Sequence, residues 1–173
     1  MTDLPHSSAR GITLVELIVV IAVLAIAAGI ATPNLTTLIN NNRTASQSNE
    51  LIALINLARS QAIRSNDTAT LQLVPGGNSW EGIVRVTAPS ADEDLQCPDI
   101  EGAIRCVGHS NVSLDSNALV ISFDSRGYIT REGGVWEPVT INLLHRGCSN
   151  PRQSRRIQIL VTGQLVATTP GCA

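Results

Sequence analysis

A long apolar run near the N-terminus constrains this chain more than any other feature. The twenty residues from Ile12 to Ala31 carry only two polar side chains, Thr13 and Glu16. At about 1.5 Å per residue, a helix of this length spans roughly 30 Å, the thickness of the hydrocarbon core of a bilayer. The segment before it is polar and ends in Arg10-Gly11. We therefore expect an N-terminal helix that lies in lipid or among other apolar helices.

Three interpretations of the run compete. A secretory signal would be discarded after cleavage at small residues, which Ala25 to Ala31 contains. A plain membrane anchor would stay intact, with Glu16 reaching to the headgroups. In the third interpretation a leader is cut off before the apolar run, which then forms the mature N-terminus.

Glu16 favours the third interpretation. A carboxylate inside a membrane span costs about 2.5–3.5 kcal/mol, and such a cost usually marks a functional partner. A cut after Gly11 would give Ile12 a cationic amine, and Glu16 would lie one helical turn away, about 6 Å along the axis. Glu16 could then pair with this amine or with that of a neighbouring subunit. It would also lie at the positive end of the helix dipole.

The motif Gly11-Ile12-Thr13-Leu14-Val15-Glu16-Leu17, followed by an apolar helix and Pro33, resembles the class III signal of type IV pilins and type II secretion pseudopilins. The resemblance implies that a prepilin peptidase cuts after Gly11 and methylates Ile12, where the family usually has phenylalanine. It implies that Glu16 guides docking into a filament with other major and minor pilins or pseudopilins. Before assembly, it implies a single-pass protein of the bacterial inner membrane with a periplasmic C-terminal domain.

The helical pattern continues beyond Pro33, where we expect a bend or local melting because proline lacks a backbone donor. We divide this part of the chain into a leader (1–11), a transmembrane half (12–33) and an amphipathic half (34–66). In the amphipathic half one apolar stripe repeats every three or four residues, and it comprises Leu51, Ile52, Ile55, Ala58, Ala62 and Ile63. Gln47, Glu50, Asn56, Arg59 and Arg64 lie largely off it.

Residues 67–173 change to a strand-like pattern. Short β-branched runs are separated by Gly, Pro, Asn and Ser, and they comprise Thr70–Val74, Trp80–Thr87, Leu119–Phe123, Val139–Leu144, Ile157–Val161 and Gln164–Thr168. Turns are expected at residues 75–78, at 125–127 before Tyr128–Thr130, and at 162–163. The sequence therefore predicts an α+β fold, in which the long N-terminal helix packs on an antiparallel β-domain.

Residues 88–118 do not follow a strand pattern and are predicted to form a loop. A loop of this length in a small domain needs a covalent cross-link to hold it in place. Four cysteines, at positions 97, 106, 148 and 172, suit two disulfides formed outside the cytoplasm. Three pairings are possible, and local pairing, Cys97 with Cys106 and Cys148 with Cys172, is the simplest. Neither His109 nor His145 stands at a recognised metal-ligand spacing, so we predict no metal site.

Four further segments narrow the resemblance to one group of this family. Asn49-Glu50-Leu51 and residues 58–62 (Ala-Arg-Ser-Gln-Ala) in the helix, a strand containing Trp80, and residues 123–127 (Phe-Asp-Ser-Arg-Gly) look like the H-type pseudopilins and their minor-pilin relatives, the GspH/FimT group. This resemblance implies two small antiparallel sheets that flank the helix, and a place in assembly initiation or at the filament tip. The leader and the domain architecture are shared by type IV pili and type II secretion pseudopili.

Charge is distributed unevenly around a net value of −2. Residues 92–101 carry five acids, whereas the 36 residues after Glu137 carry four arginines and no acid. The arginines Arg146, Arg152, Arg155 and Arg156 are candidate DNA-binding residues, because clustered cations can contact successive phosphates. Some relatives bind DNA through a Gly-Arg-x-Arg motif, whose nearest equivalent here, residues 163–166, lacks both arginines. The alternatives to a filament subunit are thus a DNA-binding minor pilin and an uncleaved, membrane-anchored periplasmic domain.

No catalytic constellation is present in the sequence. The nucleophile motif Gly-x-Ser-x-Gly is absent, and Gly76-Gly77 lacks the lysine and the helix start of a phosphate-binding loop. We therefore predict neither enzyme activity nor a cofactor.

Overall fold

The computed structural model describes residues 11–86, 102–130 and 138–172, and it describes residues 30–34 by their backbone alone. The chain divides into two compact units, Met1–Ile39 and Asn40–Ala173. The first unit holds the start of one long helix. The second holds the rest of that helix and every described strand.

Helix α1 comprises Leu14–Ser65. Thr13 caps its start, because the Thr13 hydroxyl oxygen accepts a hydrogen bond of 3.2 Å from the backbone N–H of Glu16. Asn66 ends the helix with a φ of 52°, a left-handed conformation that asparagine tolerates better than most residues. The helix continues through Pro33 rather than melting there.

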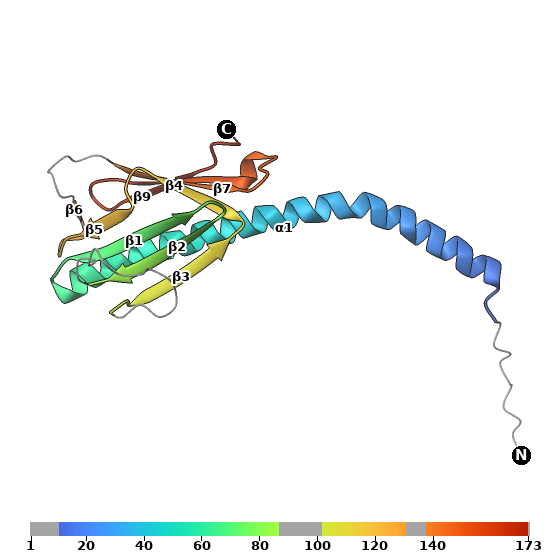
Figure 1. Cartoon of the computed structure of the whole chain (residues 1–173), viewed down its shortest axis with the longest axis horizontal. Coiled ribbons are helices and arrows are strands. Elements are labelled where there is room, and N and C mark those ends of the chain that lie inside the picture. The colour runs from blue at the N-terminus through green and yellow to red at the C-terminus, as the bar shows by residue number, and fades with distance from the viewer. Residues whose placement is uncertain (1–10, 87–101, 131–137, 173) are drawn as a thin grey trace, which may run out of the picture. The chain divides into compact units, whose positions relative to one another are not determined.

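The second unit contains two antiparallel sheets, which confirms the predicted fold class. The first sheet has the order β3-β2-β1-β5-β6, and its strands are β1 (Ala69–Gly76), β2 (Ser79–Arg85), β3 (Arg105–Ser110), β5 (Val120–Phe123) and β6 (Ile129–Thr130). The second sheet has the order β4-β7-β8-β9, and its strands are β4 (Val112–Ser116), β7 (Val139–His145), β8 (Ser154–Ile159) and β9 (Leu165–Thr168). A short 3-10 helix, η1 (Pro151–Gln153), precedes β8. Figure 1 shows β1, β2 and β3 along the second half of α1, with β7 and β9 in a separate sheet.

The predicted loop over 88–118 is wrong in its described part, because residues 105–116 form β3 and β4. Strand β3 is an edge strand whose side chains are all at least partly exposed, and it contains Gly108 and three polar residues. Strand β4 does alternate, with Val112 and Leu114 buried, but its other three residues are two serines and an aspartate, which are typical of turns. Pairing with β2 and β7 decides the structure of this segment, and local composition does not.

The apolar stripe of α1 forms the centre of the core. Leu51, Ile55, Ala58 and Ala62 are fully buried, as predicted, and Leu54 is buried with them. Ile63 is 48% exposed and lies outside the core, contrary to our expectation. The helix lies very close to β2, because a Cβ added at Gly82 would come within 2.6 Å of the Leu54 Cδ1 atom.

Two polar side chains off the apolar stripe join the helix to both sheets. The indole N–H of the fully buried Trp80 donates a 2.9 Å hydrogen bond to Gln47 Oε1, and Gln47 Nε2 donates a 2.9 Å bond to the Ser110 carbonyl. Farther along the helix, Arg59 donates to the carbonyl oxygens of Gly127 and Thr162, at 3.0 and 3.2 Å. These carbonyls belong to the turns before β6 and β9, so Arg59 links one turn of each sheet to α1.

Glu50 holds the edge strand β3 against the helix. Its two carboxylate oxygens lie 3.1 Å from Arg105 Nη2 and 3.1 Å from His109 Nε2. The His109 ring also packs on Trp80, with 4.8 Å between the ring centroids. Strand β3 is therefore held by side-chain contacts to α1 as well as by its pairing with β2.

Candidate functional site

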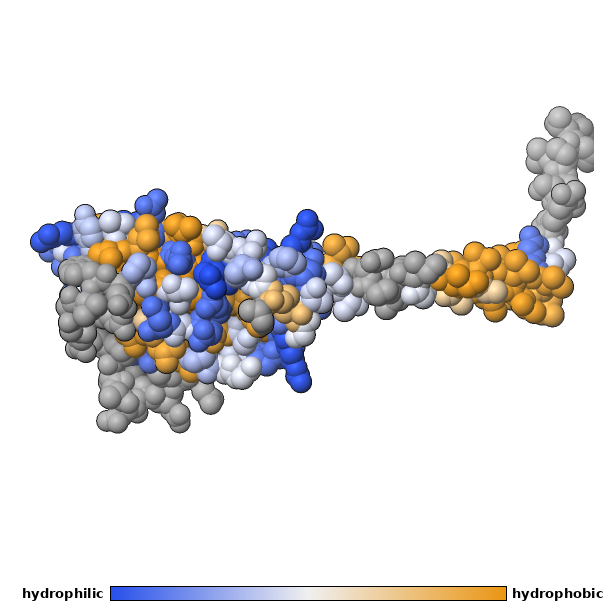
Figure 2. Space-filling model, turned by 90° about the horizontal axis from the view of Figure 1, so that it is seen from above, coloured by the Kyte–Doolittle hydropathy of each residue, from blue (hydrophilic) through white to orange (hydrophobic). Residues whose placement is uncertain are grey.

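The start of α1 is an exposed apolar surface. All the described side chains from residue 11 to residue 29 are exposed, and the large apolar ones between Ile12 and Ile26 are 49% to 77% exposed. Figure 2 shows this stretch as a nearly unbroken apolar surface. Monomeric soluble proteins rarely expose contiguous apolar patches of more than a few hundred Å². A surface of this kind needs an apolar partner.

Glu16 is the acidic residue of this surface. Its carboxylate is exposed and forms no hydrogen bond or ion pair with the described residues, although its backbone N–H donates to the Thr13 hydroxyl. Sequence reasoning missed the role of Thr13, even though Thr13-x-x-Glu16 has the spacing of a capping box. The capping contact starts the helix and leaves the Glu16 carboxylate available for another partner.

A search for helices that could cross a membrane finds none of sufficient length and hydropathy among the described residues. The side chains of residues 30–34 lie outside the described set. Likewise, residues 1–10 of the predicted leader and the acidic stretch 92–101 lie outside it.

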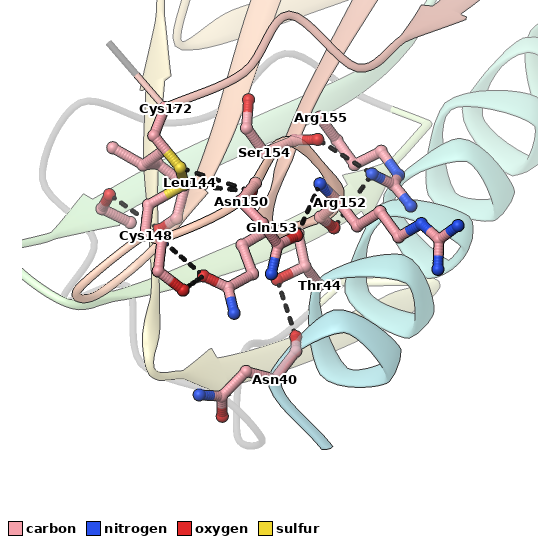
Figure 3. Close-up of a disulfide and its surroundings, with 12 residues drawn as sticks. Asn40, Thr44, Leu144, Cys148, Asn150, Arg152, Gln153, Ser154, Arg155 and Cys172 are labelled. Carbon is pink, nitrogen blue, oxygen red and sulfur yellow. Dashed lines mark hydrogen bonds between the residues drawn. A yellow bond between two sulfur atoms is a disulfide. The ribbon is translucent and has the colours of Figure 1, made fainter. Parts of the chain in front are cut away.

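The C-terminal pair of cysteines forms the predicted local disulfide. Cys148 and Cys172 are bonded, with their Cα atoms 5.7 Å apart, and the bond ties the segment after β9 to the turn after β7. Figure 3 shows Gln153 and Asn150 beside this bond. The Asn150 carbonyl lies 3.3 Å from Cys172 Sγ, and Gln153 Oε1 accepts a 2.7 Å bond from the backbone of Ser149. Cys106 is also disulfide-bonded, but the other member of its predicted pair, Cys97, lies outside the described residues.

Replacing Cys148 and Cys172 together with serine is expected to lower the free energy of unfolding by about 3 kcal/mol, because the bond closes a loop of 24 residues in the unfolded chain. Urea denaturation followed by circular dichroism measures the loss. The double variant is a better probe than a reducing agent, since a reductant would also open the disulfide of Cys106. A denaturation midpoint equal to that of the parent chain would contradict the prediction.

The four candidate DNA-binding arginines come from three places in the fold: the turn after β7, η1 and β8. The strand predicted from Ile157 begins earlier, at Ser154, so Arg155 and Arg156 are consecutive residues of β8 and point to opposite faces of the sheet. Arg156 donates to Asn142 Oδ1 at 2.9 Å, whereas Arg155 donates to the carbonyls of Arg152 and Ser154. Arg146 lies beyond the end of β7. DNA binding by these four arginines stays a prediction.

The described residues contain no group of three or more His, Cys, Asp or Glu side chains that could hold a metal ion. The structural features that stand out are thus an apolar helix and a compact β-domain.

Comparison with protein families gives two matches. The model of the type II transport protein GspH matches residues 47–163, and the prokaryotic N-terminal methylation motif matches residues 6–32. The chain belongs to the GspH family. Its members are pilin and pseudopilin subunits of the GspH/FimT type and not enzymes. The methylation motif implies processing by a prepilin peptidase and assembly with other pilins.

The solved structure of a minor pilin shows the same fold. Two crystal forms of the type IV minor pilin FimU of Pseudomonas aeruginosa match with a TM-score of 0.51. In one form, 15% of residues are identical, and the match covers 72% of this chain and 91% of FimU. The minor pseudopilin EpsH from the type 2 secretion system of Vibrio cholerae has a TM-score of 0.48 and 16% identity, over 75% of this chain and 99% of EpsH. No curated protein matches the chain.

Proposed function

We propose that the chain is a minor subunit of a type IV pilus or a type II secretion pseudopilus, with a role in assembly initiation or at the tip. In this proposal the chain is held in the inner membrane before assembly and is cut between Gly11 and Ile12. Its β-domain then lies outside the filament core, where it contacts neighbouring subunits.

The exposed apolar start of α1 is the observation that carries this proposal. Its large side chains, from Ile12 to Ile26, would be unfavourable in water by about 25 cal/mol for each Å² of apolar surface. A lipid bilayer before assembly, and the helices of other subunits after it, would remove this surface from water. The second unit has a separate core, formed by the half of α1 that begins at Asn40 and by the two sheets, and does not need this segment to fold.

Glu16 supports filament assembly over simple anchoring. In a bundle of apolar helices an unpaired carboxylate is costly, and the amine created at Ile12 would supply an opposite charge. Within one chain the two groups are separated by about 6 Å along the helix axis. The amine of a neighbouring subunit would serve equally well, and such pairing would set the axial position of one subunit against the next.

Mass spectrometry of the intact protein after extraction from membranes tests the processing step. We expect the chain to begin at Ile12 and to carry one added methyl group when it is produced with a prepilin peptidase. The matched variant is Gly11→Val, which should retain the leader. Because no atom lies within 4 Å of a Cβ placed at Gly11, this substitution leaves the fold undisturbed. A parent chain that still begins at Met1 would support an uncleaved anchored domain instead.

A further inference from the structure

Strand β9 forms one edge of the second sheet, and this edge has no feature that prevents it from pairing with another strand. Among the described strands, the two sheets end in β3, β6, β4 and β9. Strand β3 holds Arg105 and is tied to Glu50 of α1, whereas β4 holds Asp115 and β6 has only two residues. Strand β9, with the sequence Leu-Val-Ala-Thr, has no charge, no proline and no glycine. Charged residues, proline and very short strands are the usual devices that keep an edge from adding a strand.

The hydrogen bonds of the β8–β9 hairpin fix which backbone groups of β9 face outwards. The Leu160 N–H donates a 2.9 Å bond to the Gln164 carbonyl in the turn that leads into β9. Hydrogen-bonded and non-hydrogen-bonded pairs alternate along an antiparallel ladder, so the second and fourth residues of β9 direct their N–H and C=O groups to β8. The first and third residues, Leu165 and Ala167, direct theirs away from the sheet, where the described part of the chain provides no partner. Two donors and two acceptors are therefore open along this edge.

Both ends of β9 are held in place. At its start, the turn from β8 is fixed to the helix, because Arg59 donates a 3.2 Å hydrogen bond to the Thr162 carbonyl. Gly163 in this turn has a φ of 76° and packs so closely on a backbone carbonyl of the turn before β6 that a Cβ atom would clash with it. At the other end, the disulfide between Cys148 and Cys172 ties the segment after β9 to the turn after β7 (Figure 3). An edge that is rigid before binding loses little conformational entropy when a strand pairs with it.

The sheet around this edge is positively charged. The 36 residues after Glu137, which contain β7, β8 and β9, hold four arginines and no acid. Arg156 is exposed on β8, the strand that pairs with β9, and donates to Asn142. A partner with acidic side chains is therefore attracted to this part of the sheet, and a basic partner is repelled.

We propose that an extended acidic segment of another subunit adds a strand to the open edge of β9. An extended backbone offers N–H and C=O groups with the same repeat as Leu165 and Ala167, so it satisfies the open donors and acceptors together. DNA phosphates are acceptors only and would leave both carbonyls without a partner. The inference rests on the proposed function only for the source of the segment, because the binding itself is a property of β9.

Amide hydrogen exchange of the full chain in detergent micelles, followed by nuclear magnetic resonance, tests the proposal. The probe is the peptide Asp-Val-Thr-Val-Thr-Val-Asp with blocked ends. In the chain alone, we expect the amides of Leu165 and Ala167 to exchange about tenfold faster than those of Val166 and Thr168, which are bonded to β8. Added peptide should slow the exchange of Leu165 and Ala167 in a saturable way. The same peptide with lysine in place of aspartate should bind about tenfold more weakly.

Ala167→Pro removes one outward N–H and should weaken binding of the aspartate peptide about tenfold. The bonds to β8 stay intact, because this N–H does not face β8. The matched control is Ala167→Ser, which keeps the N–H and should bind as the parent does. Thermal denaturation checks that both variants are folded, and the exchange measurement on the parent chain needs no variant.

Three results would overturn the proposal: no protection of the Leu165 and Ala167 amides by the aspartate peptide, equal protection by the lysine peptide, or a folded Ala167→Pro variant that binds as Ala167→Ser does. Protection that rises with protein concentration in the absence of peptide would also overturn it, because the edges of two copies would then pair with each other. A chain that binds the peptide but keeps its leader when produced with a prepilin peptidase would refute the proposed function alone.

Discussion

Glu16→Ala is expected to abolish incorporation into filaments while membrane insertion continues. The substitution removes the only charge from the described apolar segment that begins at Ile12, so insertion into lipid becomes more favourable. Pairing with an N-terminal amine is lost, and breaking a buried ion pair by removing one partner costs about 3–5 kcal/mol. The amount of the subunit in sheared filaments, relative to the membrane fraction, should therefore fall by about a hundredfold in an immunoblot.

Two control variants separate charge pairing from helix capping at this site. Thr13→Ala removes the hydroxyl that accepts from the Glu16 N–H and should cost about 1 kcal/mol of helix stability, with incorporation largely kept. Glu16→Gln retains a polar side chain of the same length but has no charge, and it should fail as Glu16→Ala does. Normal incorporation of Glu16→Gln, or of Glu16→Ala itself, would contradict the proposed role of the carboxylate.

Trp80→Ala is expected to lower the free energy of unfolding by about 3–5 kcal/mol. Trp80 is among the largest fully buried side chains, and its removal leaves a cavity between β2 and α1. It also leaves Gln47 Oε1 without the indole donor at 2.9 Å. A domain of this size is stable by about 5–15 kcal/mol, so a large part of the total would be lost. Thermal and urea denaturation of the parent and the variant measure the difference.

Trp80→Phe separates the two contributions of this side chain to stability, its apolar packing and its indole hydrogen bond. Phenylalanine keeps most of the apolar contact but has no indole N–H, so its main cost is the buried oxygen of Gln47, about 1–3 kcal/mol. Tyr128→Ala is the surface control, because Tyr128 is 43% exposed, and it should change stability by less than about 1 kcal/mol. A Trp80→Ala variant as stable as this control would refute the packing argument.

The amphipathic half of α1 illustrates how far periodicity predicts a fold. The three- and four-residue spacing placed Leu51, Ile55 and Ala58 on the buried face, and the structure confirms this. It did not predict Gln47, which is buried off the apolar stripe because Trp80 and Ser110 supply its hydrogen-bond partners. A residue whose burial depends on partners 33 and 63 positions away has no signal in a short window of sequence.

The candidate sites also include features that the local sequence predicts and features that only the fold brings together. The methylation motif could be read from consecutive residues, since a peptidase recognises a continuous segment. The open pocket beside the disulfide of Cys148 and Cys172 could not, because its lining residues come from four separate parts of the chain: the turn at Gly77, strand β4, the end of β7 and the C-terminal cysteine. In the same way, the arginines of β8 look like one cluster in the sequence, but strand alternation separates Arg155 from Arg156.

The sequence by itself determined the apolar N-terminal helix with Glu16 inside it, the change from a helical to a strand-like pattern after residue 66, and the positions of most strands. These features follow from local hydrophobic spacing and from nearby turn residues. Only the tertiary structure decided that residues 105–116 form strands, that Cys148 pairs with Cys172, and that His145 is buried with no hydrogen-bond partner among the described residues. The physical reason is that edge strands, disulfides and buried polar groups depend on partners distant in the sequence, and folding brings these partners together.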